Sequence, residues 1–436
     1  MKRKLAVLLT AATVFSAILP TTCMAAEKKA DIPEGTTISF WHAMGGVNGE
    51  APDYLVNKFN EENEYGIKVD SQYQGEYDDE INKLKSAQLG NMGADLVQIY
   101  DIGTRFMIDS GWVIPMQDMI DSEGYDVSDL EPNITAYYTV DDKLYSMPFN
   151  SSTPILYYNK DMFEEHGWEV PTTWTEFTNL CDQIQSEGIQ PLYFGFKDTW
   201  TTLAPWNAIA VSLCDSDLTY QVNSGETTFA ENYREVAEKE KALLAYGQKD
   251  PVSQGYNDAC TAFARGTSAM FTIGSYAISQ IKSVNPDMNI GSFVFPANED
   301  ADKNVLNSGN DLMFCVMKDC KNKEAAYEVL SYMLEDENVK KYLNAQSAVP
   351  CKKGDFEITP ELEEMRDYIE NGIVADYQDH HYPSEMSVDA MIQTYLMDDS
   401  ADATDTFMKR FDKEWIRYNR DVVAKVKAYE EGNDHE

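Results

Sequence analysis

Residues 148–160 read PFNSSTPILYYNK, and the rest of the chain is organised around this stretch. It opens with small hydroxyl and amide side chains and continues into a β-branched and aromatic run, a pattern that predicts a buried strand. Small hydrogen-bonding groups at the mouth of a strand suit a site that binds a polar ligand closely. The alternative is a polar loop that leads into an ordinary strand, so the rest of the chain has to decide between the two.

Strands and helices alternate on both sides of this stretch. Before it, residues 36–41 and 67–69 read as strands, and residues 96–100 form a nearly continuous apolar strand. After it the alternation restarts, with strands expected at residues 191–196, 268–273 and 311–317. Buried apolar strands that alternate with helices predict an α/β fold with mostly parallel sheets. Because no Pro- or Ser-rich linker intervenes, we expect two α/β lobes whose connections cross through a hinge.

The first residues indicate export. Three basic residues precede the apolar run 5–19, and small residues follow it. This order is typical of a secretory signal peptide, here residues 1–25. Cys23 stands where a bacterial lipoprotein carries its modified cysteine, whereas cleavage after Ala25 would release a soluble protein. We expect an extracytoplasmic protein in either case, with membrane contact only through a lipid anchor, because no later apolar run reaches the roughly 18 residues of a membrane span.

The charge balance is strongly acidic. With 35 Lys and Arg against 74 Asp and Glu, the formal net charge is −39. The signal peptide holds three basic residues and no acidic one, so its removal takes the charge to −42. Such a surface repels nucleic acid and anionic membranes. It also disfavours anionic ligands, unless a local basic cluster overrides the field.

The usual patterns of catalysis and cofactor binding are missing. The five histidines form no H-E-x-x-H pattern, and neither G-x-S-x-G nor the glycine-rich phosphate-binding patterns occur. Six cysteines follow Cys23 without a C-x-x-C pair; disulfides are permitted, but buried free thiols are the simpler expectation. We expect no cofactor, no metal and no catalysis. A secreted glycan-active enzyme with a carboxylate pair remains the rival hypothesis.

Aromatic side chains gather where the expected strands end. They make up 12% of the chain, and several stand beside polar groups, such as Trp41 next to His42. In an open α/β sheet, ligands bind at the carboxyl ends of the strands. An aromatic ring covers the apolar face of a sugar, and Asp, Asn and Ser side chains bond its hydroxyl groups. The placement of these residues as a group therefore favours a sugar site.

Several short motifs occur along the two expected lobes. The first lobe carries FWHAM at residues 40–44, IYDIGT at 99–104 and PFNSSTP at 148–154. The second carries AMF at 269–271, SYA at 275–277 and PDMNIG at 286–291. These motifs resemble those of the extracellular solute-binding proteins of family 1, which serve ABC transporters for sugars and glycerol-3-phosphate. The similarity runs from about residue 36 to the end of the chain, and the motifs occur in the family's order.

The resemblance implies a type II periplasmic-binding-protein fold, with two α/β lobes that each hold a mostly parallel sheet flanked by helices. The lobes are joined by a hinge and close on a ligand in the cleft. We expect lobe 1 from residues 36–150 and 306–350, lobe 2 from residues 151–305, and a helical part, residues 351–436, that packs mainly on lobe 2. The implied partners are a small carbohydrate ligand and ABC permease subunits, and the protein itself is expected to be a monomer.

The same resemblance places several residues at or near ligand-contacting positions: Tyr77, Asp101, Ser152, Trp174, Ser275 and Gly309. Trp174 has a structural alternative, because a tryptophan at a helix start often only plugs a lobe. We expect four residues to stack on the sugar: Trp41, Trp200, Trp206 and Tyr382. We expect polar contacts from five: His42, Asp101, Asn150, Ser152 and Asp311. Four neighbours complete the expected site: Ser151, Tyr276, Asn310 and His381.

The motifs match the glycerol-3-phosphate binder of the family best, yet the residues that would hold a phosphate differ. Ala348 stands where that binder has a tyrosine, and no Arg or Lys occurs between Arg366 and Lys409, the region where it has an arginine. Phosphate groups need Arg or Lys partners in a dry cleft. Residues 310–311 resemble the sugar-binding branch instead. We therefore predict the binding protein of a carbohydrate importer, which captures a neutral sugar, first of all an oligosaccharide. A glycerol-3-phosphate or glycerophosphodiester binder is the alternative.

Overall fold

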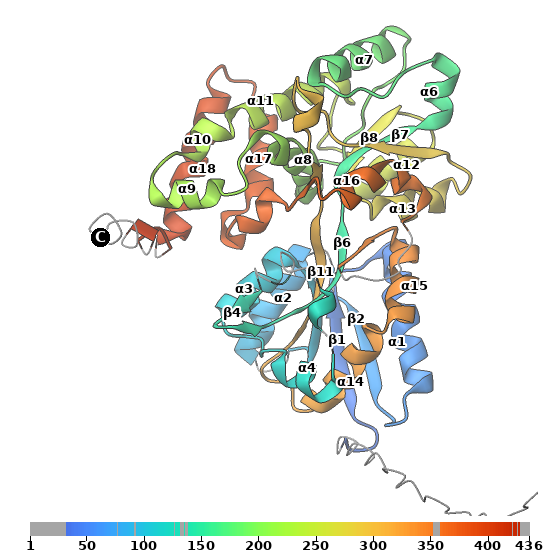
Figure 1. Cartoon of the computed structure of the whole chain (residues 1–436), viewed down its shortest axis with the longest axis vertical. Helices are drawn as coiled ribbons and strands as arrows, with labels where there is room; N and C mark the ends of the chain where they lie inside the picture. Colours follow the sequence, from blue (N-terminus) through green and yellow to red (C-terminus); the bar gives the residue numbers. More distant parts are fainter. Residues whose placement is uncertain are drawn as a thin grey trace, which may run out of the picture.

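The chain folds into two lobes, one above the other in Figure 1, that are connected by extended strands. The two-lobed α/β fold class expected from the sequence is confirmed. The signal peptide, Cys23 included, lies outside the described residues. The computed structural model describes residues 32–75, 77–90, 93–125, 127–130, 135, 138–351, 358–420, 422–424 and 426–427.

Lobe 1, the lower one in Figure 1, is built from two separate parts of the chain. The first part contains β1 (Thr37–His42), η1 (Gly46–Gly49), α1 (Glu50–Glu62), β2 (Lys68–Tyr73), α2 (Tyr77–Gly90), β3 (Leu96–Tyr100), α3 (Asp101–Asp109), α4 (Gln117–Glu123), η2 (Val127–Asp129), β4 (Thr139–Val140), β5 (Lys143–Leu144) and β6 (Met147–Ser152). The second part contains β11 (Gly309–Val316), α14 (Lys323–Met333), α15 (Asp336–Gln346) and β12 (Val349–Pro350).

Lobe 2, the upper one in Figure 1, also combines two parts of the chain. The first contains β7 (Ile155–Asn159), α6 (Lys160–His166), α7 (Trp174–Ser186), η3 (Thr199–Thr202), α8 (Leu203–Leu213), α9 (Leu218–Ser224), α10 (Phe229–Asn232), α11 (Arg234–Leu243), η4 (Leu244–Tyr246), α12 (Tyr256–Ala264), β8 (Met270–Ile273), α13 (Ala277–Val284), β9 (Ile290–Phe293), η5 (Ala301–Lys303) and β10 (Leu306–Asn307). The second contains η6 (Pro360–Met365), α16 (Arg366–Glu370), β13 (Val374–Ala375), η7 (Gln378–His381), η8 (Ser384–Met386), α17 (Val388–Leu396) and α18 (Ala403–Tyr418).

The sheets contain more antiparallel pairs than the sequence led us to expect. In lobe 1 the strand order is β12-β6-β11-β3-β1-β2, and β1 pairs in parallel with β2 and β3. The strands next to the hinge differ, because β11 runs antiparallel to both β3 and β6. In lobe 2, β7 lies between β8 and β9 and is antiparallel to both, since it leaves the hinge while they run back toward it.

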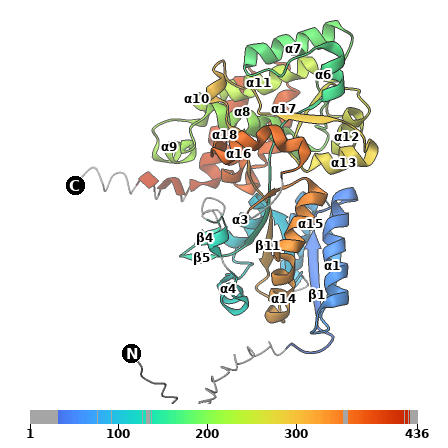
Figure 2. The same ribbon diagram turned by 45° about the vertical axis from the view of Figure 1, so that its right-hand side comes forward.

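Each lobe has its own apolar core or cores. One core joins the helices and strands of residues 38–149 to those of residues 312–348. A second core joins residues 156–297 to residues 382–415, so α17 and α18 pack on lobe 2 (Figure 2). A third, smaller core lies in lobe 2 around β7, α12 and α13. These cores support the expected division of the chain into lobes, whose bounds remain a prediction.

One predicted strand differs from the structure. Residues 191–196 were expected as a strand but are part of no helix or strand. Their backbone is bonded elsewhere, with the Leu192 N–H donating to the Tyr246 carbonyl and the Phe194 N–H to the Gln248 side chain. Within the helical part expected for residues 351–436, α18 ends at Tyr418, and the described residues 420, 422–424 and 426–427 beyond it are again helical.

Candidate functional site

The cleft between the lobes contains a cavity of ≈ 320 Å³. Small-molecule sites typically have about 300–1,000 Å³. The last residues of β2 and β3 line it, as do residues that come after β1 and β8, in keeping with ligand binding at the carboxyl ends of strands. Part of the predicted site lines this cavity, namely Tyr77, Asn150, Ser152, Trp200, Ser275, Tyr276, Asn310, Asp311 and Tyr382.

The floor of the cavity is formed by β6 and β11, which connect the lobes. Their register shifts between Asn310 and Leu312, so Asp311 is left out of the strand pairing and lines the cavity. A bulge of this kind redirects a side chain. Asn150 Nδ2 donates to Asp311 Oδ2 over 3.1 Å. Burial raises the pKa of Asp311 to about 6, although the hydrogen bond from Asn150 opposes the rise.

Ser151, Ser152 and Gly309 lie beside this floor but have different environments. Ser152 lines the cavity, and its Oγ lies 2.5 Å from Tyr377 Oη. Ser151 alternates to the other face of β6 and is not a lining residue. Gly309 packs so closely against Asp376 that a Cβ atom would clash with the carboxylate. The prediction that Ser151 and Gly309 contact the ligand is therefore corrected. Both are structural residues of the hinge.

The lobe 1 wall of the cavity consists of uncharged residues, mostly tyrosines and amides. The rings of Tyr77 and Tyr100 lie 4.4 Å apart at an angle of 30°. Burial raises the pKa of Tyr77 well above its ordinary value, so its hydroxyl stays a neutral donor. The full lobe 1 wall comprises Ala43, Met44, Gly45, Gly46, Asn48, Tyr73, Tyr77, Tyr100, Tyr342, Gln346 and Ala348.

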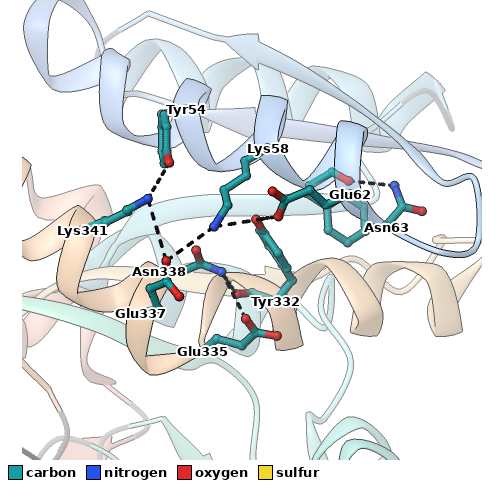
Figure 3. Close-up of polar contacts among 10 residues, drawn as sticks. Tyr54, Lys58, Glu62, Asn63, Tyr332, Glu335, Glu337, Asn338 and Lys341 are labelled. Carbon is teal, nitrogen blue, oxygen red and sulfur yellow. Dashed lines mark hydrogen bonds and ion pairs between the residues drawn. The ribbon is translucent and has the colours of Figure 1, made fainter.

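A polar network fixes the helix that carries Tyr342 into this wall. Figure 3 shows α15 held against α1, with Lys341 Nζ donating to Tyr54 Oη over 2.6 Å. Lys58 Nζ lies 3.8 Å from a carboxylate oxygen of Glu337 in the same network. Exposed ion pairs contribute at most about 1 kcal/mol each. The network therefore orients α15 more than it stabilises the lobe.

Trp41, His42 and Asp101 stand at strand ends, as predicted, but the first two do not reach the cavity. Trp41 is partly buried and packs against the core of lobe 1. His42 is 2% exposed behind the lobe 1 wall, and this burial lowers its pKa. The expected sugar contacts of Trp41 and His42 are therefore corrected. Asp101 begins α3, and its side chain lies outside the described part of the structure.

The lobe 2 wall carries an aromatic cluster formed by Trp200, Tyr256 and Tyr276. The ring of Trp200 lies 5.1 Å from that of Tyr256 and 5.8 Å, edge-on, from that of Tyr276. Trp200 lines the cavity and is only partly buried, so part of its side chain is accessible to a ligand. The full lobe 2 wall comprises Thr199, Trp200, Leu203, Ala204, Asn207, Tyr256, Asn257, Ser275, Tyr276, Gln280, Tyr377, Asp379, His380, Tyr382, Pro383, Ser387, Val388 and Asp389.

Three carboxylates line the cavity, Asp311 on the floor and Asp379 and Asp389 on the lobe 2 wall. The Asp379 N–H donates to Asn207 Oδ1 over 3.2 Å, and burial raises the pKa of its carboxyl to about 6. Asp389 Oδ2 accepts from Thr199 Oγ1 over 2.5 Å. Among the described residues that line the cavity, none is Lys or Arg. This lining therefore disfavours the binding of an anionic ligand.

Some buried polar atoms at the cavity lack a hydrogen-bond partner among the described residues. They include Asn150 Oδ1, Ser275 Oγ and Asp379 Oδ1. A buried polar group left unpaired costs about 1–3 kcal/mol. Hydroxyl groups of a ligand would supply the missing bonds, so the arrangement suits a polyhydroxylated molecule beside aromatic faces.

Trp206 and Tyr382 belong to the core of lobe 2. Trp206 is 0% exposed, stacks on Phe411 and donates from Nε1 to Tyr382 Oη over 3.1 Å. Tyr382 reaches the cavity but is only 3% exposed, and its hydroxyl donates to Tyr233 Oη over 2.9 Å. Neither ring offers a face to a sugar. Both stacking predictions are corrected. Trp200 and Trp206 were predicted to have the same role, but Trp200 lines the cavity and Trp206 does not.

His381 and Trp174 also lie away from the cavity lining. The lining residue is His380, whose Nδ1 lies 2.8 Å from Asp376 Oδ1. His381 is partly buried, and burial lowers its pKa. Trp174 begins α7 beneath the ammonium group of Lys239, which lies 4.3 Å from the ring centroid. Trp174 therefore has a structural role in lobe 2 and does not line the cavity.

Sequence reasoning missed most lining residues that come from helices. Tyr342 and Gln346 are four residues apart at the end of α15, a spacing that places both on one helix face. That spacing was a usable signal, but nothing in it says which face meets the cleft. The other missed polar and aromatic lining residues include Asn48, Tyr73, Asn207, Tyr256, Asn257, Gln280, Tyr377, Asp379, His380 and Asp389.

In the part of the chain that the structure describes, no three His, Cys, Asp or Glu side chains gather in a way that could hold a metal ion. No described helix combines the length and apolar character needed to cross a membrane. The six cysteines after Cys23 are free thiols, and all except Cys214 are buried.

Comparison with known proteins gives a consistent result. The family model described as bacterial extracellular solute-binding protein matches residues 46–340. The sn-glycerol-3-phosphate-binding periplasmic protein UgpB of Escherichia coli (strain K12) is 28% identical over 345 residues, which cover 75% of this chain and 76% of the relative.

Two solved structures share the fold. RafE in complex with raffinose has a TM-score of 0.73 at 23% identity and covers 87% of this chain and 99% of its own. A sugar transporter from Bacillus licheniformis in complex with stachyose has a TM-score of 0.71 at 20% identity and covers 88% of this chain and 100% of its own. At these identities the likeness establishes the fold and leaves the ligand open.

Proposed function

Because the chain belongs to the bacterial extracellular solute-binding proteins, we propose that it captures a neutral sugar between its lobes and delivers it to an ABC importer. An oligosaccharide is the first candidate, since the proteins of similar fold include ones bound to raffinose and stachyose. The chain is a binding protein and not an enzyme. The permease subunits of the importer are its proposed macromolecular partners.

The composition of the cavity lining carries this proposal. Three carboxylates, an aromatic cluster and several amides surround the cavity, and no described lining residue is a Lys or Arg. Carboxylates accept hydrogen bonds from sugar hydroxyls, and an aromatic ring covers the apolar face of a sugar ring. A phosphate carries about −1.5 to −2 charges and would meet repulsion here. A neutral polyhydroxylated ligand satisfies the lining best.

The binding mechanism follows from the two-lobed fold. In the open form, the aromatic cluster and Asp379 of lobe 2 receive the sugar. The tyrosines of lobe 1 then cover its other side as the lobes close about β6 and β11. Closure is a population shift, driven by contacts that only the closed form makes. Release to the permease reverses these contacts without any chemical step.

The relative that binds sn-glycerol-3-phosphate supports a second candidate, a glycerol-3-phosphate or glycerophosphodiester ligand. The similarity covers most of both chains, so a shared ligand class is a fair hypothesis. Against it stand the acidic lining and Ala348, which offers no hydrogen bond to a phosphate.

A thermal-shift screen of the mature protein separates the two candidates. We would test raffinose, stachyose and galactose against glycerol-3-phosphate and glycerophosphocholine. A ligand at 100 times its Kd adds about 2.7 kcal/mol of stability, which raises the Tm clearly. We expect a shift with at least one neutral sugar and none with glycerol-3-phosphate. A shift with glycerol-3-phosphate alone would overturn the sugar proposal.

Export and anchoring also remain proposals, because residues 1–31 lie outside the described structure. We propose that the signal peptide directs the chain across the membrane and that Cys23 carries a lipid anchor. Mass spectrometry of the mature N-terminus decides between a lipid-modified Cys23 and a free N-terminus after Ala25. Gel filtration of the soluble part tests the proposed monomer.

A further inference from the structure

We infer that His42 is a positioning residue: it holds residues 43–49 of lobe 1 in place against the cleft, and through them it sets the affinity for the ligand. The effect of His42 on ligand affinity rests on the proposed function. Its positioning of residues 43–49 can be tested without any ligand. His42 lies at the carboxyl end of β1, directly before the segment in question.

The ring of His42 is bonded at both nitrogens. The Met44 N–H donates to Nδ1 over 3.2 Å, and Nε2 lies 3.0 Å from Ser71 Oγ. Because Nδ1 accepts a bond, the ring proton must be on Nε2, which then donates to Ser71. Ser71 Oγ in turn donates to Asp53 Oδ1 over 3.4 Å. Burial lowers the pKa of His42, which keeps Nδ1 unprotonated and able to accept.

The segment that follows His42 is tightly folded. A Cβ at Gly45 would clash with the hydroxyl of Tyr73, and one at Gly49 would clash with the Met44 carbonyl. Gly46 has φ +57°, a conformation that favours glycine. With so little room, the bond from the Met44 N–H to His42 fixes where the segment starts its turn.

The same segment touches both the cavity and the opposite lobe. Residues 43–46 and Asn48 line the cavity. Asn48 Oδ1 accepts from Ser279 Oγ of α13 in lobe 2 over 2.7 Å. The Asn48 carbonyl accepts from Gln346 Nε2 over 2.8 Å. A displacement of the segment would therefore alter the cavity rim and a contact between the lobes together, although His42 itself reaches neither.

Two substitutions separate the roles of the two ring nitrogens. In His42→Asn, the amide oxygen can take the place of Nδ1 and accept from the Met44 N–H. In His42→Gln, the longer amide reaches toward the place of Nε2 and leaves the Met44 N–H without its acceptor. Both variants lose the buried ring, so a purely structural role predicts similar losses for both. His166→Gln in lobe 2, whose ring bonds Glu187, is the control.

Hydrogen–deuterium exchange of peptides covering residues 43–49, without sugar, is the first readout. We expect at least tenfold faster exchange in His42→Gln, with His42→Asn and His166→Gln close to the wild type. Raffinose binding by calorimetry is the second, and its Kd should rise at least tenfold in His42→Gln and about threefold or less in His42→Asn. Equal exchange in the two His42 variants overturns the inference. If raffinose binds no variant and not the wild type, that sugar is wrong as the ligand, and exchange still decides the role of His42.

Discussion

The two walls of the cleft differ in chemistry. The lobe 1 wall presents tyrosines, amides and small residues, all uncharged, whereas the lobe 2 wall presents the aromatic cluster together with Asp379, His380 and Asp389. Charged acceptors give strong, directional hydrogen bonds, roughly twice as strong as neutral ones. We propose that lobe 2 supplies most of the recognition and that lobe 1 acts mainly as a cover.

Trp200→Ala is expected to have the largest effect, because it removes the exposed ring of the lobe 2 cluster. The loss of apolar and stacking contact should cost about 2–3 kcal/mol of binding free energy, roughly a 30- to 150-fold rise in Kd. Calorimetric titration with the best sugar of the thermal-shift screen measures it. Trp174→Ala is the matched control in the same lobe and should lower the Tm without changing the Kd. Equal losses of affinity would show that the cluster is not the stacking surface.

Asp311→Asn tests the floor on which both walls stand. Burial raises the pKa of Asp311 to about 6, so the folded state favours the protonated carboxyl. That stabilisation is complete below the ordinary pKa and disappears as the pH rises through the folded value. At about pH 8 the uncharged variant should therefore be more stable than the wild type by about 2–3 kcal/mol, with almost no difference below about pH 4.

Thermal denaturation across this pH range measures the Asp311 effect. Asp319→Asn, an exposed carboxylate after β11, is the control and should leave the pH profile of the wild type unchanged. Parallel profiles for Asp311→Asn and the wild type would mean that Asp311 is not desolvated in the cleft. The cavity floor would then be wetter than the structure indicates.

Tyr77→Ala measures how much the lobe 1 wall contributes. The substitution removes one ring of the Tyr77–Tyr100 pair, and we expect a loss of about 1–1.5 kcal/mol, a 5- to 12-fold rise in Kd. Tyr220→Ala, which removes a tyrosine exposed on lobe 2 outside the cavity lining, should leave the Kd unchanged. If Tyr77→Ala costs more than Trp200→Ala, the lobes have exchanged roles and lobe 1 is the primary binding surface.

How much could be predicted from the sequence depends on the type of element that carries a residue. Strand ends were informative: the polar residues of 150–152 and Asp311 flank apolar runs that can only be buried strands, and this places them at the edge of a sheet. Of these four residues, Ser151 does not line the cavity, because side chains alternate along β6. The bulge in β11 that leaves Asp311 out of the strand pairing is also invisible in the sequence.

Helices and short turns were much less informative. Tyr256 and Tyr342 lie on helices whose tilt decides which face meets the cleft, and that tilt depends on packing between distant segments. The choice between His380 and His381 depends on one step in a 3-10 turn. Trp206 was misread, yet a signal existed: residues 203–213 read LAPWNAIAVSL, and a helix that is apolar on all sides is buried on all sides.

Ser279→Ala tests the cover function of lobe 1 without touching the cavity lining. Ser279 Oγ donates to Asn48 Oδ1 across the lobes over 2.7 Å and also to the Tyr276 carbonyl of its own helix. Losing the interlobe bond should cost about 0.5–1.5 kcal/mol, a 2- to 12-fold rise in Kd, because only the closed form makes it. Ser283→Ala on the same helix removes only a bond to the Gln280 carbonyl and should change nothing. If Ser279→Ala and Ser283→Ala have the same Kd, the bond between Asn48 and Ser279 does not help to close the lobes. The lobe 1 wall would then favour closure only through its contacts with the sugar.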